Sequence, residues 1–255
     1  FGLIVPDAYG GNEMSKTGLS KLLQRVASVS TSASVHIMVP ASLGPAELLS
    51  HYGTDAQKRK YLPKLAEGAI PCFGLTSLDA GSDAAGSMVD IGRVSSCGNR
   101  IELNCDKRYI TLAPVADLIG IAFKIEDPDG TLASRCGRVV DGEITLALIE
   151  RSRRGMAIGP YSDPLGVGFA NGTIKCTNVN LNIEEDVIGG LDGVGKGWQF
   201  LMEALAAGRG IALPAGAAGA AKLLTNATAG YAALRVQFKQ PLVAFEGVQE
   251  KLADM

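Results

Sequence analysis

Histidine is scarce in this 255-residue sequence, and closely spaced cysteine pairs are missing. There are two histidines, and the five cysteines show no Cys-x-x-Cys spacing. A zinc site or a Ser-His-Asp triad is therefore poorly supported, and we expect no metal site. An odd, scattered set of cysteines fits reduced thiols of a cytosolic protein better than a disulfide framework. These residues are His36, His51, Cys72, Cys97, Cys105, Cys136 and Cys176.

The sequence also lacks a dominant charge and a long uncharged apolar run. Its formal net charge is −2 and no stripe of Lys and Arg is present, so we expect no nucleic-acid partner. The most apolar stretch, 200–224, contains Glu203, Arg209 and Lys222, which excludes a simple membrane-spanning helix. No Gly-x-Gly-x-x-Gly follows a predicted strand, which argues against a Rossmann nucleotide site.

The periodicity of the apolar residues divides the chain into three parts. Before residue 70 they recur at helix spacing, and Thr54 followed by Asp55 is typical of a helix N-cap. Short β-prone runs broken by Gly, Asp and Asn begin at Cys72, and a helix-like sequence pattern returns after Gly190. We predict helices over 1–70, a β domain over 71–188 and helices over 189–255. The expected strands are 72–76, 100–105, 108–112, 118–125, 144–150 and 173–181, with hairpin turns at 129–130 and 141–142, in a compact barrel or sandwich.

Two of these segments carry the residue types that a flat aromatic cofactor needs. They are Cys72-Phe-Gly-Leu-Thr-Ser-Leu-Asp-Ala-Gly-Ser-Asp83 and Lys107-Arg-Tyr-Ile-Thr-Leu-Ala-Pro114. Each is an apolar strand that ends in hydroxyls and small residues, which supplies a floor for a ring and hydrogen bonds for its polar edge. Taken alone, each segment could equally be a buried strand that ends in a polar turn.

In this order, the segments resemble the flavin-binding segments of the acyl-CoA dehydrogenase family. Pro6-Asp-Ala-Tyr-Gly-Gly11 resembles the family's early turn, and the whole chain follows the family pattern, with similarity to the large bacterial enzymes of fatty-acid β-oxidation. The resemblance implies an α+β fold with N-terminal helices, a central β-barrel or sandwich and the start of a C-terminal helical bundle. Both ends of the chain look cut, so we expect a piece of a longer protein.

The resemblance implies FAD as the cofactor and assigns roles to ten residues. The first segment would line or hydrogen-bond the flavin, the second would pack on the ring and bond its reactive nitrogen, and an Arg-x-x-Phe turn would contact the FAD of a neighbouring subunit. Ser82 and Arg209 would also approach the substrate. The cofactor set is Phe73, Leu75, Thr76, Ser82, Tyr109, Ile110, Thr111, Arg235 and Phe238.

The chain departs from the family pattern at three of these places. Ser77-Leu78 stands where most members have Glu-Pro, Tyr109 where Trp is commoner, and Lys239 where the Arg-x-x-Phe turn usually has Gly. The departures at Ser77-Leu78 and Lys239 affect the shape of two turns, and the one at Tyr109 affects the side chain that packs on the cofactor ring.

The implied reaction is the α,β-dehydrogenation of fatty acyl-CoA to trans-2-enoyl-CoA, in which a carboxylate removes the α-proton and the β-hydrogen leaves as hydride to the flavin. We expect the base beyond Met255, because the alternative family position is Gly208 here and Glu203 lies on the wrong face of its helix. The expected partners are fatty acyl-CoA, an electron-transfer flavoprotein or equivalent acceptor, and further copies of the chain. The expected location is the cytoplasm, peripheral to the inner membrane.

Two other functions fit the same resemblance. One is a catalytically silent member of the family that serves as a structural or interaction subunit. The other is a flavin oxidase or monooxygenase on the same fold, in which the reduced flavin would react rapidly with O₂. The length of the acyl chain is not fixed by the sequence.

Overall fold

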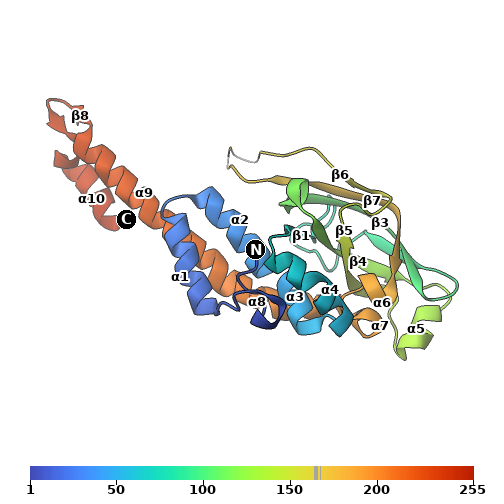
Figure 1. The fold of residues 1–255 in the computed structure, drawn as a ribbon. Helices are drawn as coiled ribbons and strands as arrows, with labels where there is room; N and C mark the ends of the chain where they lie inside the picture. Colours follow the sequence, from blue (N-terminus) through green and yellow to red (C-terminus); the bar gives the residue numbers. More distant parts are fainter. Residues whose placement is uncertain (164–165, 167) are drawn as a thin grey trace.

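The computed structural model describes residues 1–163, 166 and 168–255 (Figure 1). Helices come first, then a sheet, then helices again, so the α+β fold class is confirmed. The N-terminal helices are α1 (Lys16–Ala27), α2 (Thr31–Leu43), α3 (Pro45–Tyr52) and α4 (Asp55–Ala66). The strands of the sheet are β1 (Pro71–Gly74), β2 (Ile91–Val94), β3 (Arg100–Thr111), β4 (Leu118–Glu126), β5 (Ile144–Glu150), β6 (Met156–Ile158) and β7 (Asn171–Asn182), with α5 (Thr131–Cys136) between β4 and β5.

The second helical part begins with two short helices, α6 (Ile183–Asp186) and α7 (Gly190–Gly193). It continues through α8 (Gly197–Ala207), a π-helical turn (Gly208–Ala212), α9 (Leu213–Leu234), a hairpin of β8 (Val236–Gln237) and β9 (Gln240–Pro241), and α10 (Glu246–Asp254). Among the described residues, none of the helices is both long and apolar enough to cross a membrane.

The N-terminal helices have the start signals that the sequence predicts. The side chain of Thr54 accepts a hydrogen bond from the backbone N–H of Gln57 (3.2 Å), and Gln57 Oε1 accepts one from the backbone N–H of Thr54 (3.0 Å). This is a capping box, which satisfies two amide groups that the first turn of α4 cannot pair internally. The N-cap predicted at Thr54 is therefore confirmed.

Within the described residues, seven strands form one mixed sheet. The order is β1-β4-β2-β3-β7-β6. β5 lies outside this order and pairs with β4. β1 and β2 run parallel to β4, whereas the other pairs are antiparallel. β4 and β5 are nearly continuous buried runs, because helices cover one of their faces and the rest of the sheet covers the other.

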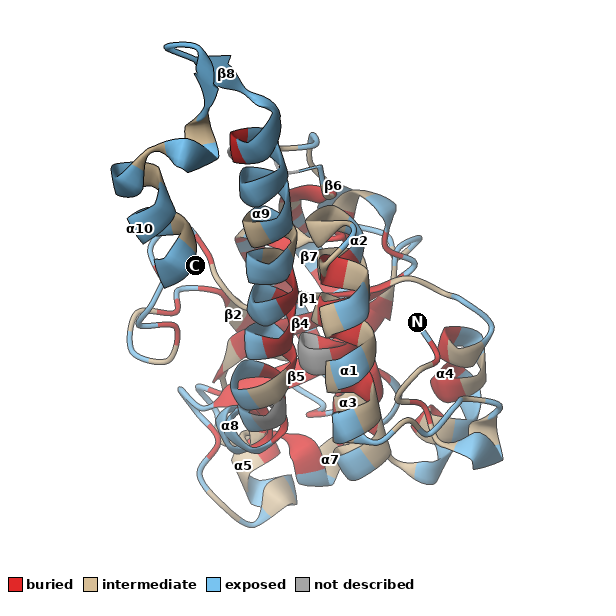
Figure 2. Ribbon diagram, turned by 90° about the vertical axis from the view of Figure 1, so that its left-hand side faces the viewer, coloured by how far each residue is buried: buried red, intermediate tan, exposed pale blue. Residues whose placement is uncertain are grey.

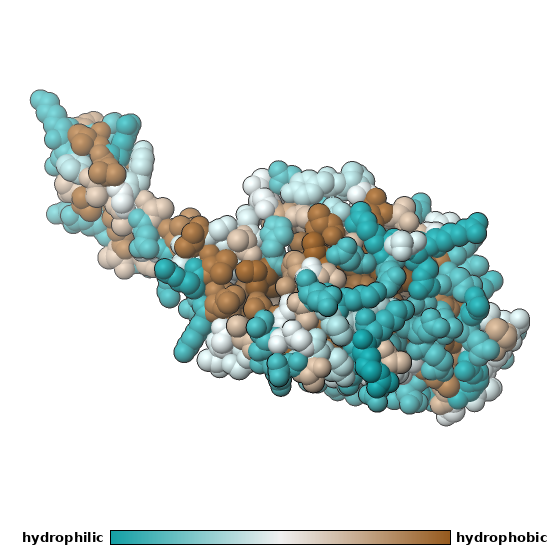
Figure 3. Space-filling model, in the orientation of Figure 1, coloured by the Kyte–Doolittle hydropathy of each residue, from teal (hydrophilic) through white to brown (hydrophobic). Residues whose placement is uncertain are grey.

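The body and the C-terminal arm differ in how much of their surface is buried. α1 packs beside the first half of α9, but the second half of α9, the β8–β9 hairpin and α10 project away from the sheet and are largely exposed (Figure 2). Apolar side chains gather on the body over α2 and beside β1 (Figure 3). The first half of α9 thus packs in an apolar cluster with α1 and α2, whereas the sheet shares a second cluster with α3, α4 and α8.

The structure corrects several strand predictions. The runs 100–105 and 108–112 belong to one strand, β3, in which the register shifts between Lys107 and Ile110. The predicted turns at 129–130 and 141–142 do not close two-residue hairpins, because α5 lies between them in a single connection. β2 and β6 were not predicted, since each has only three or four residues and β2 has a glycine at Gly92.

Gly120 on β4 gives a direct test of the packing under β1. A methyl group at this position would lie 2.5 Å from Cδ2 of Phe73, so the ring or the strand would have to move. We expect Gly120→Ala to lower the free energy of unfolding by about 1–3 kcal/mol, the usual cost of overpacking. Gly230→Ala on the exposed part of α9 is the control, because it meets open space and should stabilise by up to about 1 kcal/mol. Urea unfolding checks both, and equal stability of the two variants would contradict the packing described.

Candidate functional site

A cavity of about 260 Å³ lies where the helices meet the ends of β1 and β3. Seven of the ten residues that the sequence singled out line it, although they come from three distant segments. The lining residues are Val39, Phe73, Leu75, Thr76, Tyr109, Ile110, Thr111, Arg209 and Leu213. A larger hollow of about 520 Å³ near Lys64 and Arg151 opens onto a charged surface, so its lining does not suit an apolar ring.

The first segment enters the cavity because a glycine on the next strand leaves room for an aromatic ring. Phe73 faces Gly120 of β4, where any side chain would meet the ring. β1 ends at Gly74, and the chain continues along the cavity through Leu75 and Thr76. The Thr76 hydroxyl donates a hydrogen bond to the carbonyl of Arg108 (2.9 Å). The end of β1 is thereby tied to β3.

The second segment reaches the cavity through a β-bulge. Four residues of β3, from Lys107 to Ile110, lie opposite three residues of β7, from Gly172 to Ile174. The extra residue leaves Tyr109 in the left-handed region, with φ of 58° and 71% of its surface exposed. Ile110 stays buried. The bulge therefore turns the aromatic side chain out of the sheet and onto the rim of the cavity.

A buried ion pair lies directly behind these two segments. The Lys107 side chain is fully buried, and its Nζ is 2.6 Å from Oδ2 of Asp90, which is also buried. The same Nζ donates to the carbonyl of Leu75 (2.9 Å), and Oδ1 of Asp90 accepts from the backbone N–H of Asp106 (3.0 Å). In the sequence, Lys107 stands out only as part of a motif and Asp90 does not stand out, because the loop 77–90 gives no signal of where its carboxylates point.

The third segment comes from the junction of α8 and α9. The junction is a π-helical turn, a local distortion common at functional sites. It brings exposed Arg209 to the cavity, where the side chain makes no hydrogen bond or ion pair with any described residue. Val39 of α2 and Leu213 of α9 complete the wall, and both were missed because apolar helix residues look the same in sequence whether they face a core or a cavity.

Ser82, predicted to contact cofactor or substrate, lies in an exposed loop and is not among the lining residues. In this loop Asp83 accepts hydrogen bonds from the backbone N–H of Gly86 (3.0 Å) and the hydroxyl of Ser87 (2.9 Å). The loop therefore has its own internal order despite the Ser77-Leu78 departure from the family pattern.

Arg235 and Phe238 lie far from the cavity in the same chain. The 22 residues of α9 separate Leu213, which lines the cavity, from Arg235, a distance of roughly 33 Å along a helix. Phe238 is 88% exposed, and both Phe238 and Lys239 have positive φ, as a two-residue type I′ hairpin requires. The turn thus forms with Lys239 in place of glycine. Its aromatic side chain has one ring neighbour among the described residues, Phe245, at 6.2 Å between centroids.

Glu203 is directed away from the cavity. Its carboxylate accepts hydrogen bonds from the Tyr52 hydroxyl and from Nε2 of Gln199 (3.0 Å), and the Tyr52 ring stacks on Phe200 at 4.0 Å between centroids. These contacts hold the pKa of Glu203 below its usual range. Among the described residues that line the cavity there is no carboxylate.

Two family models match the chain. One describes the N-terminal domain of acyl-CoA dehydrogenases and matches residues 1–69; the other describes the C-terminal domain and matches 195–255. Together they cover just over half of the chain.

Curated relatives match almost the whole chain. A probable acyl-CoA dehydrogenase of Mycobacterium tuberculosis is 31% identical over 99% of the chain, and a 3-(aryl)acrylate reductase of Clostridium sporogenes is 32% identical over 100%. The very long-chain specific acyl-CoA dehydrogenase of Bos taurus mitochondria is 33% identical over 100%. The chain spans 37%, 63% and 37% of the length of these three relatives, respectively.

Solved structures share the fold over nearly the full chain. Butyryl-CoA dehydrogenase of Megasphaera elsdenii superposes with a TM-score of 0.83 and 27% identity, over 99% of this chain and 63% of that one. An acyl-CoA dehydrogenase of Bacillus anthracis in complex with FAD gives 0.81 and 27%, over 98% and 40%.

The pairing of Tyr52 with Glu203 predicts an unusual tyrosine titration. Burial, and then the hydrogen bond to Glu203, raises the pKa of Tyr52 to about 12. Because the folded pKa exceeds the unfolded value of 10.0, stability from this tyrosine is present below pH 10.0 and is lost as pH rises toward 12. Difference absorbance between the wild type and Tyr52→Phe should show ionisation near pH 12, and Glu203→Gln should lower that midpoint. A Tyr52 midpoint near 10 would contradict the contact.

Proposed function

Because the chain belongs to the acyl-CoA dehydrogenase family, we propose that it forms the FAD-ring site of an enzyme that converts fatty acyl-CoA thioesters into trans-2-enoyl-CoA. The observation that carries this proposal is the cavity in which three distant segments converge. It has an apolar wall, two threonine hydroxyls and one arginine that pairs with none of the described residues. These are the groups that a flat ring with a polar edge and an acyl thioester need side by side.

The lining residues fit the ring system of FAD. Phe73, Leu75 and Ile110 provide an apolar surface. The Thr76 hydroxyl already donates to a backbone carbonyl, so it can offer the cofactor its lone pairs. Thr111 has no side-chain hydrogen bond to a described residue, so its hydroxyl is free to donate. The two threonines thus supply one acceptor and one donor for the polar edge of the ring.

When bound, FAD supplies the hydride acceptor for the β-hydrogen of the substrate. The residues of the chain have the tasks of binding, orientation and exclusion of water. Tyr109 on the rim would cover the ring, and Arg209 would approach the thioester ligand. The α-proton needs a carboxylate, and we propose that it is supplied from beyond Met255, since Glu203 is held by Tyr52.

The proposed function includes partners that the cavity alone does not specify. The enzyme would pass its electrons to an electron-transfer flavoprotein or an equivalent acceptor. The exposed Arg235 and Phe238 would contact the FAD of a neighbouring subunit in a homo-oligomer, which fits their distance from the cavity of their own chain. Ser82 would join the site from its loop, and the enzyme would work in the cytoplasm, peripheral to the inner membrane.

Replacement of Thr111 tests the predicted hydrogen bond to the ring. We expect Thr111→Val to weaken FAD binding about tenfold, or to shift the reduction potential of the flavin, because a buried hydrogen bond is lost while the volume is kept. Flavin fluorescence titration and a potentiometric titration measure the two quantities. Thr177→Val is the matched control on the exposed face of β7 and should change neither. Wild-type affinity and potential in Thr111→Val would contradict the assignment.

Replacement of Glu203 tests whether the base lies elsewhere. In the full-length protein, Glu203→Gln should leave the rate of flavin bleaching by saturated acyl-CoA within about twofold of wild type under anaerobic conditions. Loss of a positioned base would instead slow it by roughly 10²–10⁴-fold. A loss of that size would identify Glu203 as the base and overturn the proposal that the base follows Met255.

A further inference from the structure

We propose that the buried Lys107–Asp90 pair is the positioning device of the cofactor site: it sets the end of β1 against the bulge of β3 and so fixes both threonine hydroxyls at the spacing that the flavin ring requires. This inference rests on the proposed function, because it concerns the same cavity. Neither residue lines the cavity, so both would act through residues that do.

Among the residues that the structure describes, the end of β1 shares no ladder of backbone hydrogen bonds with β3. β1 pairs with β4, in parallel, and its register ends at Gly74. Beyond that point, three hydrogen bonds and one isolated β-bridge hold it to β3. Lys107 Nζ donates to the carbonyl of Leu75 (2.9 Å). The N–H of Arg108 donates to the carbonyl of Thr76 (3.1 Å), and the Thr76 hydroxyl donates to the carbonyl of Arg108 (2.9 Å). The bridge joins Ser77 and Lys107.

The ion pair extends this link to two further strands. Asp90 immediately precedes β2, and its carbonyl accepts from the N–H of Lys124 on β4 (2.9 Å). Its Oδ1 accepts from the N–H of Asp106 on β3 (3.0 Å). The side chains of the pair thus join the residue after the end of β1, the residue before β2, and β3, while the backbone carbonyl of Asp90 links the same point to β4. A charge-assisted bond of this kind is shorter and roughly twice as strong as a neutral one.

Because of its position, the Lys107–Asp90 pair would set the geometry of the two cavity segments and not only the stability of the protein. The next residues after Lys107 are the bulge, with Tyr109 in the left-handed region, and then Ile110 and Thr111 of the cavity. A strained residue persists only where its surroundings hold it firmly. The stem of Lys107 also packs over Gly74, where a methyl group would lie 3.2 Å from Lys107 Cγ. Movement of Lys107 would therefore displace both cavity segments together.

The test removes both charges at once. Asp90→Asn with Lys107→Met keeps similar volumes and leaves no unpaired buried charge, a change that folded proteins often tolerate. We expect the full-length double variant to keep its melting temperature within a few degrees and to lose FAD affinity by at least about tenfold, because the carbonyl of Leu75 loses its charged donor. The visible absorbance bands of any bound flavin should also broaden, which a change in stability alone would not cause.

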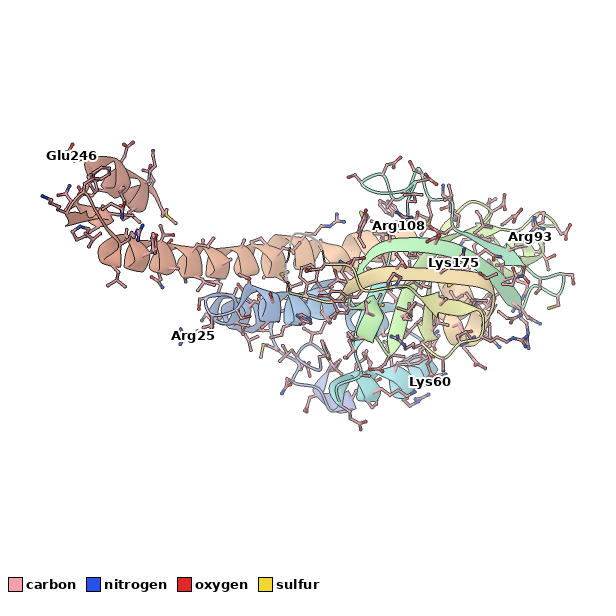
Figure 4. The ribbon with its side chains drawn as sticks, turned by 90° about the horizontal axis from the view of Figure 1, so that it is seen from above. Arg25, Lys60, Arg93, Arg108, Lys175 and Glu246 are labelled. Atoms are coloured by element: carbon pink, nitrogen blue, oxygen red, sulfur yellow. The ribbon has the colours of Figure 1, made fainter. Side chains whose placement is uncertain are left out.

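The matched control removes an exposed ion pair between neighbouring strands. Arg93 on β2 and Glu126 on β4 are joined by two hydrogen bonds of 2.9 and 2.8 Å. Arg93 lies at the opposite end of the molecule from the C-terminal arm, whereas Arg108, a residue of the second cavity segment on β3, lies between them (Figure 4). Arg93→Gln with Glu126→Gln should leave FAD affinity and absorbance unchanged.

Each outcome decides the question. Wild-type FAD affinity and absorbance in a folded Asp90→Asn, Lys107→Met variant would overturn the positioning role while leaving the proposed function intact. If the wild-type protein itself binds no FAD, both fail. Should the double variant not fold, Asp90→Asn alone is the second test, because it keeps the size of the side chain and one acceptor oxygen for the N–H of Asp106 but replaces the oxygen that faces Lys107 with an amide donor. It is expected to weaken FAD binding several-fold, and wild-type affinity in that variant would overturn the inference.

Discussion

Four strands of the sheet meet at one buried charge pair, and the candidate site depends on it. Lys107 and Asp90 are shielded from water, yet each carries more than one contact: Lys107 holds Asp90 and the carbonyl of Leu75, while Asp90 also holds the N–H of Asp106. Burial of two charges is favourable only when such additional hydrogen bonds are made. The arrangement thus places a buried, hydrogen-bonded layer beneath a cavity whose own walls include strand ends and a bulge.

The cavity is built from exceptions to regular structure. Gly120 removes a side chain so that Phe73 can lie flat against β4, the bulge of β3 turns Tyr109 outward, and a π-helical turn brings Arg209 inward. Each exception costs local stability and is tolerated because the surrounding apolar core is large. Their convergence on one cavity is better explained by a ligand site than by packing alone.

The sequence was sufficient for the helical regions at both ends of the chain, the long buried strands and seven of the lining residues, because periodicity, capping residues and a family-like motif are all local signals. It did not predict α5. The sequence was insufficient where the position of a residue depends on contacts between segments that are distant in the chain. Nothing local shows that Val39 and Leu213 face the cavity or that Asp90 is buried behind it, since an apolar or acidic residue has the same sequence signal in a core, a cavity or a loop. The continuity of β3 was missed because a bulge looks like a strand boundary in sequence.

The central claim is that the cavity between β1, β3 and the α8–α9 junction holds the ring of FAD. A crystal structure of the full-length protein with its flavin tests this most directly. The account predicts that the ring lies in this cavity, with its polar edge at Thr76 and Thr111 and one side against Phe73 and Leu75. A flavin ring bound elsewhere, with these residues in contact only with protein, would contradict it.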